Sequence, residues 1–313
     1  MSGQSRSDAP VPRVDGRHPA VDMDTARRLG ADLGAGRIDD MDRHGIDMAV
    51  VSWTSPTQLA PGDAAVELAR AANDRLATAV SEHPDRLAGF ATLPWQRPAE
   101  AVAELDRAVG ELGLRGVLIV GRPGAGFLDD PVHRPLLRRL ADLGVPLYLH
   151  PFPPLLEVQQ AYYSGFNDKV TAELSLGGWG WHHEAGNPRP RVSSSPGIFD
   201  ELPGLQIISG HWGEMVPFFL PRLDDVLSPR RHRTVQDHQR HLPVPRLGHP
   251  QRHVPPAPVR LRPRGRRHRP HHLVDRLPFL HLDGTQEFLS GLDLSHGERE
   301  QITHGNAARL LGL

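Results

Sequence analysis

Residues 116–120, GVLIV, and residues 131–151, PVHRPLLRRLADLGVPLYLHP, decide the fold. The first is a short apolar run, and the second begins with an amphipathic helix, Pro131–Leu143, and ends in another apolar run, Pro146–His150. Two strands that are joined through one helix, with no hairpin turn signal between them, pair in parallel. This stretch therefore predicts an α/β fold with a parallel sheet.

The same alternation extends to both sides of this stretch. Apolar β-branched runs predict further strands, and stretches with apolar residues on one helical face predict the helices between them. No glycine-rich phosphate loop follows the first strand, so a (β/α)8 barrel is favoured over a doubly wound sheet. The expected strands are Met48–Trp53, Gly89–Pro94, Gly116–Val120, Pro146–His150 and Gln206–Gly210, and the expected helices are Ala64–Glu82, Ala101–Leu112, Pro131–Leu143 and Glu214–Val226.

The C-terminal part of the chain is again typical of a globular protein. A strand is expected at Pro278–Leu282 and helices at Gly284–Leu289 and Ser295–Leu311. The last helix begins with a Ser-x-x-Glu pattern, Ser295 to Glu298, which is the signature of a capping box.

Two windows interrupt this pattern. Residues 186–196, GNPRPRVSSSP, contain prolines that block a helix. In residues 230–276, 29 of 47 residues are Arg, His or Pro, and this window carries +11 of charge against −12 for the rest of the chain. Such a segment cannot bury a core. It is either a disordered basic arm that binds nucleic acid or a coding sequence read out of frame, and we favour the second hypothesis.

Composition limits the kind of metal site and the compartment. The chain has no cysteine, so any metal must be bound by His, Asp or Glu. No stretch approaches the roughly 18 apolar residues that span a bilayer, and residues 1–14 contain no apolar signal segment. We therefore expect a cytoplasmic protein with no membrane partner.

Histidines end two of the predicted strands. His150 ends one strand and His211 follows another, and in a parallel barrel both positions lie at the carboxyl-end mouth, where active sites are built. From spacing alone, each is a candidate metal or catalytic residue or a structural histidine. Glu214 either orients His211 or occupies the first turn of a helix. The cluster WGWHHE, residues 179–184, offers Trp179, Trp181 and Glu184 as substrate contacts or as core residues.

Five segments in order resemble the metal-dependent decarboxylases related to the amidohydrolases, above all the γ-resorcylate and dihydroxybenzoate decarboxylases and, more distantly, aminocarboxymuconate-semialdehyde decarboxylase. The resemblance covers about residues 37–228 and 278–313. The segments are RIDDMDRHGID (37–47), PDRLAGF (84–90), FLDDP (127–131), LYLHP (147–151) and ISGHWGE (208–214).

The resemblance implies a site and a reaction. His150 corresponds to the metal-ligand histidine of the fifth barrel strand, His211 to the histidine that contacts substrate, and Glu214 to the acid that accompanies it. One divalent ion, Zn²⁺ in preference to Mn²⁺, holds a small aromatic or unsaturated carboxylic acid, and a metal-bound Asp protonates the carbon that loses CO₂. Asp275 is the candidate for that Asp, both as catalytic residue and as metal ligand. The resemblance also implies a homodimer or homotetramer.

The chain departs from the family pattern at both ends of the barrel. The first strand of the family carries a Glu-x-His or His-x-His pair, where this chain has VDGRH (14–18) outside any apolar run. The last strand ends in Ser-x-Asp-Tyr-Pro-Phe, where this chain has LVDRLPF (273–279). When Val-Asp-Arg-Leu is back-translated as GTC GAC CGA CTA and read one base later, it gives Ser-Thr-Asp, which is the missing Ser-x-Asp motif. This supports the hypothesis that residues 230–276 are read out of frame.

We therefore expect a poorly ordered segment, 1–36, followed by an amidohydrolase-like barrel, 37–313, interrupted at 186–196 and 230–276. The first strand would be missing and the last two disrupted, which would leave the barrel incomplete and could leave this chain inactive. Two alternatives stay open: a metal-dependent hydrolase of the same superfamily, and an inactive barrel with a basic nucleic-acid-binding arm.

Overall fold

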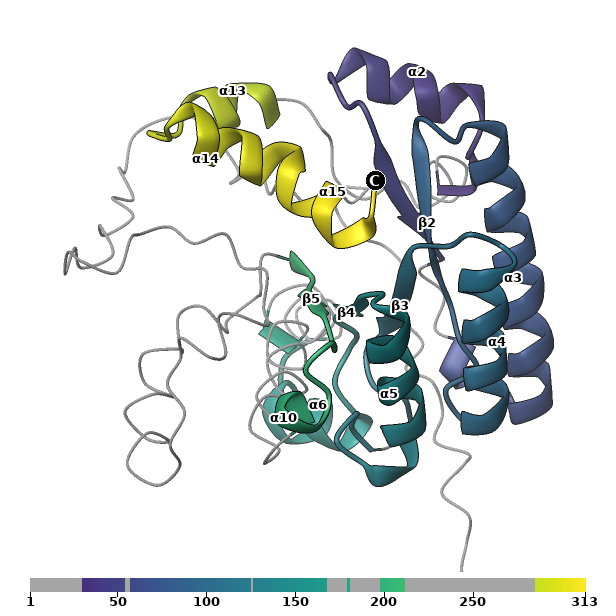
Figure 1. Ribbon diagram of the computed structural model, residues 1–313. Helices are drawn as coiled ribbons and strands as arrows, with labels where there is room; N and C mark the ends of the chain where they lie inside the picture. Colours follow the sequence, from purple (N-terminus) through teal and green to yellow (C-terminus); the bar gives the residue numbers. More distant parts are fainter. Residues whose placement is uncertain (1–29, 54–56, 125, 168–178, 181–197, 212–284) are drawn as a thin grey trace, which may run out of the picture.

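The computed structural model describes residues 30–53, 57–124, 126–167, 179–180, 198–211 and 285–313 (Figure 1). Within these residues, five strands form one parallel sheet: β1 (Ala49–Ser52), β2 (Leu87–Ala91), β3 (Gly116–Val120), β4 (Leu147–His150) and β5 (Ile207–Ser209). The helices and helical turns are α2 (Ala35–Arg43), η2 (Thr57–Leu59), α3 (Gly62–Glu82), α4 (Pro98–Gly110), η3 (Pro131–His133), α5 (Arg134–Leu143), α6 (Leu156–Tyr162), α10 (Ile198–Glu201), α13 (Thr285–Ser290), α14 (His296–Glu300), η7 (Gln301–Gly305) and α15 (Asn306–Leu311).

The strands follow one another across the sheet in sequence order, β1-β2-β3-β4-β5, and every neighbouring pair is parallel. A doubly wound sheet reverses its direction at a switch point, whereas a barrel adds each strand on the same side of the last. The described sheet contains no such reversal. It has the winding of a (β/α) barrel, as the sequence predicts.

The observed strands lie within three residues of the predicted bounds. The largest difference is at β2, which begins two residues before the expected Gly89 and ends at Ala91 rather than Pro94. The backbone N–H of Thr92 leaves the sheet because it donates to Asn73 Oδ1 at 2.9 Å, and Pro94 has no N–H to donate. Strand β2 therefore ends where α3 takes over its hydrogen bonding.

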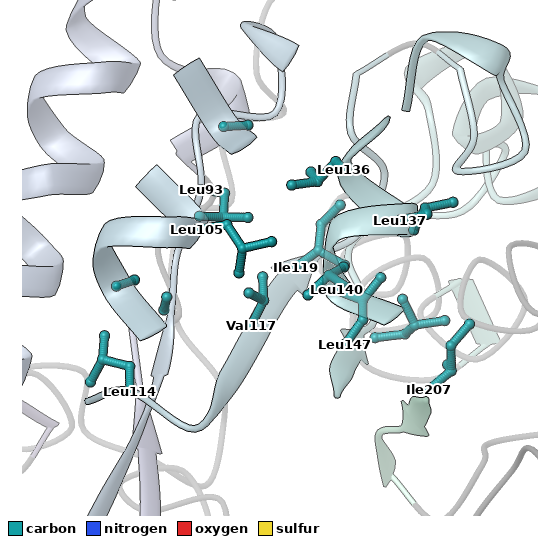
Figure 2. Close-up of a cluster of buried hydrophobic side chains, with 14 of the residues drawn as sticks. Leu93, Leu105, Leu114, Val117, Ile119, Leu136, Leu137, Leu140, Leu147 and Ile207 are labelled. Atoms are coloured by element: carbon teal, nitrogen blue, oxygen red, sulfur yellow. The ribbon is translucent and has the colours of Figure 1, made fainter. Parts of the chain in front are cut away.

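Helices α3, α4 and α5 cover one face of the sheet (Figure 1). Between them and the strands lies the main hydrophobic core, part of which is drawn in Figure 2. Val117 and Ile119 of β3 point into this core, where they join Leu105 of α4 and Leu136 of α5. Because side chains alternate along a strand, the neighbours of Val117 and Ile119 face the other way.

That opposite, inner face carries a second, smaller cluster. Phe90, Leu118 and Val120 from β2 and β3 are buried there together with Leu311 of the C-terminal helix. Tyr148, Phe152, Ile208 and Leu310 are partly buried against them. The inner face of the described sheet is thus covered in part by α15, the last helix of the chain.

A buried polar network ties α3 and α4 to the turn that follows β2. Asn73 Nδ2 donates to Thr92 O at 2.9 Å and to Glu104 Oε1 at 2.7 Å, and both Asn73 and Glu104 are buried. Arg107 donates to both oxygens of Glu104, at 2.9 and 2.8 Å, and this hydrogen bonding raises the pKa of Arg107. The charge of Glu104 is therefore compensated inside the protein.

The helix predicted to begin with a capping box does so. Ser295 Oγ accepts from Glu298 N, and the Glu298 side chain accepts from Ser295 N at 2.9 Å. Hydrogen bonding from Ser295 lowers the pKa of the Glu298 carboxyl. The expected helix Ser295–Leu311 is observed as α14, η7 and α15 in succession, with a π-helical turn at η7.

Several predictions concern residues outside the described parts of the chain. They are the strand Pro278–Leu282, the helix Glu214–Val226, the windows 186–196 and 230–276, and residues 1–29 of the expected N-terminal segment. Among the described helices, none has both the length and the apolar character that a membrane crossing requires.

Candidate active site

Two histidines meet at the carboxyl ends of adjacent strands. Leu149 of β4 is in register with Ser209 of β5, and Gly210 N donates to Leu149 O at 3.1 Å, so the pairing continues to the residue before His211. The Nε2 atoms of His150 and His211 lie 3.4 Å apart, and their rings are perpendicular with centroids 4.9 Å apart. The two residues that the sequence singles out by strand-end position are therefore brought into contact.

The backbone fixes the protonation pattern of His150. Its Nδ1 lies 2.6 Å from the carbonyl oxygen of Pro151, which only accepts hydrogen bonds, so Nδ1 carries the proton. In neutral imidazole the other nitrogen, Nε2, then presents a lone pair, and this is the nitrogen that faces His211. Metal-ligating histidines commonly donate their second ring N–H to a carbonyl in this way.

His211 sits on an uncommon backbone conformation. Its φ is 51°, and among the described residues it is the only non-glycine with positive φ. The left-handed region is unfavourable for a side chain with a Cβ, and such outliers persist where the surrounding structure holds them, often at functional sites. Histidine is among the non-glycine residues that adopt this region more often than others, but the residue type alone does not predict it here, because most histidines lie in other regions.

The separation of the two nitrogens is that of a direct contact. Because His150 Nε2 presents a lone pair, His211 Nε2 can donate a hydrogen bond to it across 3.4 Å. Among the described residues, no group of three or more His, Asp or Glu side chains is placed to bind a metal. The described part of the site therefore offers one candidate metal ligand, His150, and a complete metal site needs others.

A family model described as amidohydrolase matches residues 14–239, which is more than half of the chain. The chain belongs to the amidohydrolase family. This confirms the resemblance inferred from the five sequence segments, and with the parallel sheet it confirms an α/β fold of the amidohydrolase type.

Two curated relatives of this amidohydrolase are decarboxylases. Decarboxylase orsB from Emericella nidulans is 37% identical over 196 residues, covering 62% of this chain and 58% of the relative. Gamma-resorcylate decarboxylase from Rhodococcus jostii is 37% identical over 217 residues, covering 66% and 64%. The matched part of this amidohydrolase thus spans about three fifths of each relative's length.

A solved structure extends the likeness to most of the chain. It is a dihydroxybenzoic acid decarboxylase from Polaromonas sp. JS666 with bound manganese and the inhibitor 2-nitroresorcinol. The TM-score is 0.74 at 27% identity, and the match covers 92% of this amidohydrolase and 88% of that chain.

Of the remaining candidate residues, the structure describes only Trp179. Trp179 is described and is 57% exposed. Trp181, Glu184, Glu214 and Asp275 lie outside the described residues, so their roles stay predictions.

Strand alternation points to one residue that was not among the candidates. Tyr148 stands two positions before His150 on the same strand, and therefore on the same face.

Proposed function

We propose that this amidohydrolase is a decarboxylase of small aromatic carboxylic acids that uses one divalent metal ion. The observation that carries the proposal is the histidine pair, with the lone pair of His150 Nε2 directed at His211 across 3.4 Å at the carboxyl ends of β4 and β5. The family membership and the decarboxylase relatives support the same reaction class.

Each candidate residue has a role in this proposal. His150 Nε2 is a metal ligand, held in the correct tautomer by Pro151. His211 contacts the substrate, and Glu214 orients His211. A bound divalent ion supplies positive charge that stabilises the substrate carboxylate and a neighbouring hydroxyl. Trp179, Trp181 and Glu184 are the proposed substrate contacts.

The reaction breaks one carbon–carbon bond and forms one carbon–hydrogen bond. When CO₂ leaves, the electron pair of the broken bond stays on the ring carbon and must receive a proton. Asp275, as a protonated carboxylic acid beside the metal ligands, is the proposed donor, and it regains its proton from solvent. The segment that carries Asp275, residues 273–279, departs from the motif that ends the last strand in the family. Activity therefore depends on whether this segment places the Asp275 carboxyl beside the metal ligands.

We propose Zn²⁺ in preference to Mn²⁺, because an imidazole ligand such as that of His150 suits Zn²⁺. The Polaromonas structure contains manganese, so both ions belong in the test. A homodimer or homotetramer is also proposed.

The test is release of CO₂ from γ-resorcylate by the purified chain with Zn²⁺ or Mn²⁺. His150→Gln removes one metal donor and is expected to lower kcat/KM by at least about 100-fold. His296→Gln, an exposed histidine of α14, is the matched control and should behave as wild type. Decarboxylation that is equal in His150→Gln and wild type would contradict the proposal.

Two other outcomes point to the alternatives. Cleavage of amide or lactone substrates without CO₂ release would favour metal-dependent hydrolysis. Absence of any turnover, together with salt-dependent binding of the full chain to DNA, would favour an inactive barrel whose basic segment binds nucleic acid.

A further inference from the structure

Tyr148 lies beneath the histidine pair on the inner face of β4. Leu147 and Leu149 are buried toward the helices, whereas Tyr148 and His150 are partly exposed on the opposite face. Tyr148 is in register with Leu118 of β3 and Ile208 of β5, and its ring packs against Phe90 at 6.2 Å between centroids. The phenol is therefore held on three sides by the inner cluster.

The edge of the Tyr148 ring rests against Gly210, the residue before His211. A Cβ at position 210 would lie 2.8 Å from Tyr148 Cε1, 2.9 Å from the Tyr148 hydroxyl oxygen and 2.8 Å from Leu149 O. Real Cβ atoms do not make contacts this short, so only glycine allows the ring to lie here. The tyrosine and the glycine form one close contact between β4 and β5.

This contact adjoins the left-handed turn at His211. An unfavourable φ of 51° needs support from neighbouring groups, since otherwise the residue relaxes to a common conformation. Gly210 is fixed on one side by its hydrogen bond to Leu149 O and on the inner side by the Tyr148 ring. The direction of the His211 side chain follows from the position of Gly210.

We propose that Tyr148 is a positioning residue whose ring, seated against Gly210, sets the turn that aims His211 Nε2 at His150 Nε2. The inference rests on the proposed function only in that His211 is taken to contact substrate. Tyr148 acts through His211, and the ring edge at Cε1, which abuts Gly210, is the part expected to carry the effect.

Three variants distinguish the contributions of the Tyr148 ring, the Tyr148 hydroxyl and the missing Cβ of Gly210. Tyr148→Leu removes the ring, and Gly210→Ala drives a Cβ into the ring and against the carbonyl oxygen of Leu149. Because a displacement of about 1 Å at a catalytic group can cost roughly 100-fold, both are expected to lower kcat by tenfold to about 100-fold with little change in KM. Tyr148→Phe keeps the ring and should retain nearly the full kcat of the wild type. Tyr162→Leu, at an exposed tyrosine of α6, is the matched control.

A second readout does not depend on activity. The imidazole ¹⁵N signals of His150 and His211, recorded with Zn²⁺ present and assigned by their loss in His150→Gln and His211→Gln, report the geometry of the pair. Tyr148→Leu and Gly210→Ala should shift the His211 signals, whereas Tyr148→Phe and Tyr162→Leu should not.

The outcomes distinguish this inference from the proposed function. If Tyr148→Leu and Gly210→Ala shift the His211 signals while the wild-type protein releases no CO₂, the positioning role is supported and the decarboxylase proposal is contradicted. Unchanged signals and unchanged kcat in Tyr148→Leu and Gly210→Ala would overturn the positioning role alone. Failure of both variants to fold would also overturn it, because Tyr148 would then be a core residue.

Discussion

At the scale of single residues, His133 makes the stability of the fold depend on pH. It is buried at the start of α5, edge-on to Trp95 with ring centroids 6.2 Å apart. Burial lowers the pKa of His133, and Asp130 opposes this only in part. The unfolded chain therefore binds the proton more readily, so the free energy of unfolding should decrease as pH falls below about 6.5.

His133→Leu should remove this part of the pH dependence. We expect urea unfolding of the wild type to give a smaller free energy at about pH 5 than at about pH 7.5, and a reduced difference in the variant. His296→Gln should keep the full difference, because His296 is exposed. Identical pH dependence in all three proteins would contradict the assignment.

The positions of His150 and His211 could be predicted because strand ends can be read from apolar runs. Their contact follows from the parallel register, which sequence-order winding implies. The left-handed backbone of His211 and the seat of Tyr148 against Gly210 could not be predicted, since both depend on how two strands meet in space. The pairing of Asn73 with Glu104, 31 positions apart, is hidden for the same reason.

At the scale of elements, two glycines at helix ends should respond oppositely to alanine. Gly144 ends α5 with a φ of 67°, and a Cβ there would meet nothing within 4 Å. Gly144→Ala should therefore lower the free energy of unfolding by about 1–2 kcal/mol, from backbone strain alone. Gly110 is the last residue of α4, and its Cβ position is also open. Because its φ is not positive, Gly110→Ala should raise the free energy of unfolding by about 0.5–1 kcal/mol.

Thermal unfolding of both variants beside wild type measures this difference. The two substitutions add the same methyl group to open space, so any difference in Tm reports backbone conformation. Equal shifts for the pair would show that Gly144 does not need its left-handed conformation.

Element bounds were predictable where one signal dominates. Strand β3 begins and ends as expected because an apolar run is followed by a glycine turn, Gly121 with a φ of 78°. Helix α4 begins at Pro98, three residues before the expected start, because proline at the first helical position costs no hydrogen bond. Strand β2 ends early because Asn73, from another element, takes the N–H of Thr92.

At the scale of the whole molecule, alternating strands and helices predict the winding of the sheet, because short connections place successive parallel strands side by side. Closure of the barrel is a different matter. It depends on segments at both ends, and residues 1–29 and 212–284 lie outside the described structure. The place of α15 was also not predicted, because an amphipathic pattern shows that a face is buried but not which surface buries it.

The packing of α15 on the inner face should make the last helix unfold together with the sheet. Leu311, 7% exposed, joins Phe90, Leu118 and Val120, so truncation to alanine removes contacts with β2 and β3. Leu311→Ala is expected to cost about 2–4 kcal/mol, whereas Leu313→Ala, at a leucine that is 49% exposed, should stay within about 0.5 kcal/mol. Urea unfolding followed by tryptophan fluorescence and by far-UV circular dichroism should give coincident transitions in wild type, because the inner cluster couples the last helix to the sheet. A helix that melts first in wild type, or a Leu311→Ala effect no larger than that of Leu313→Ala, would show that α15 rests on the sheet without stabilising it.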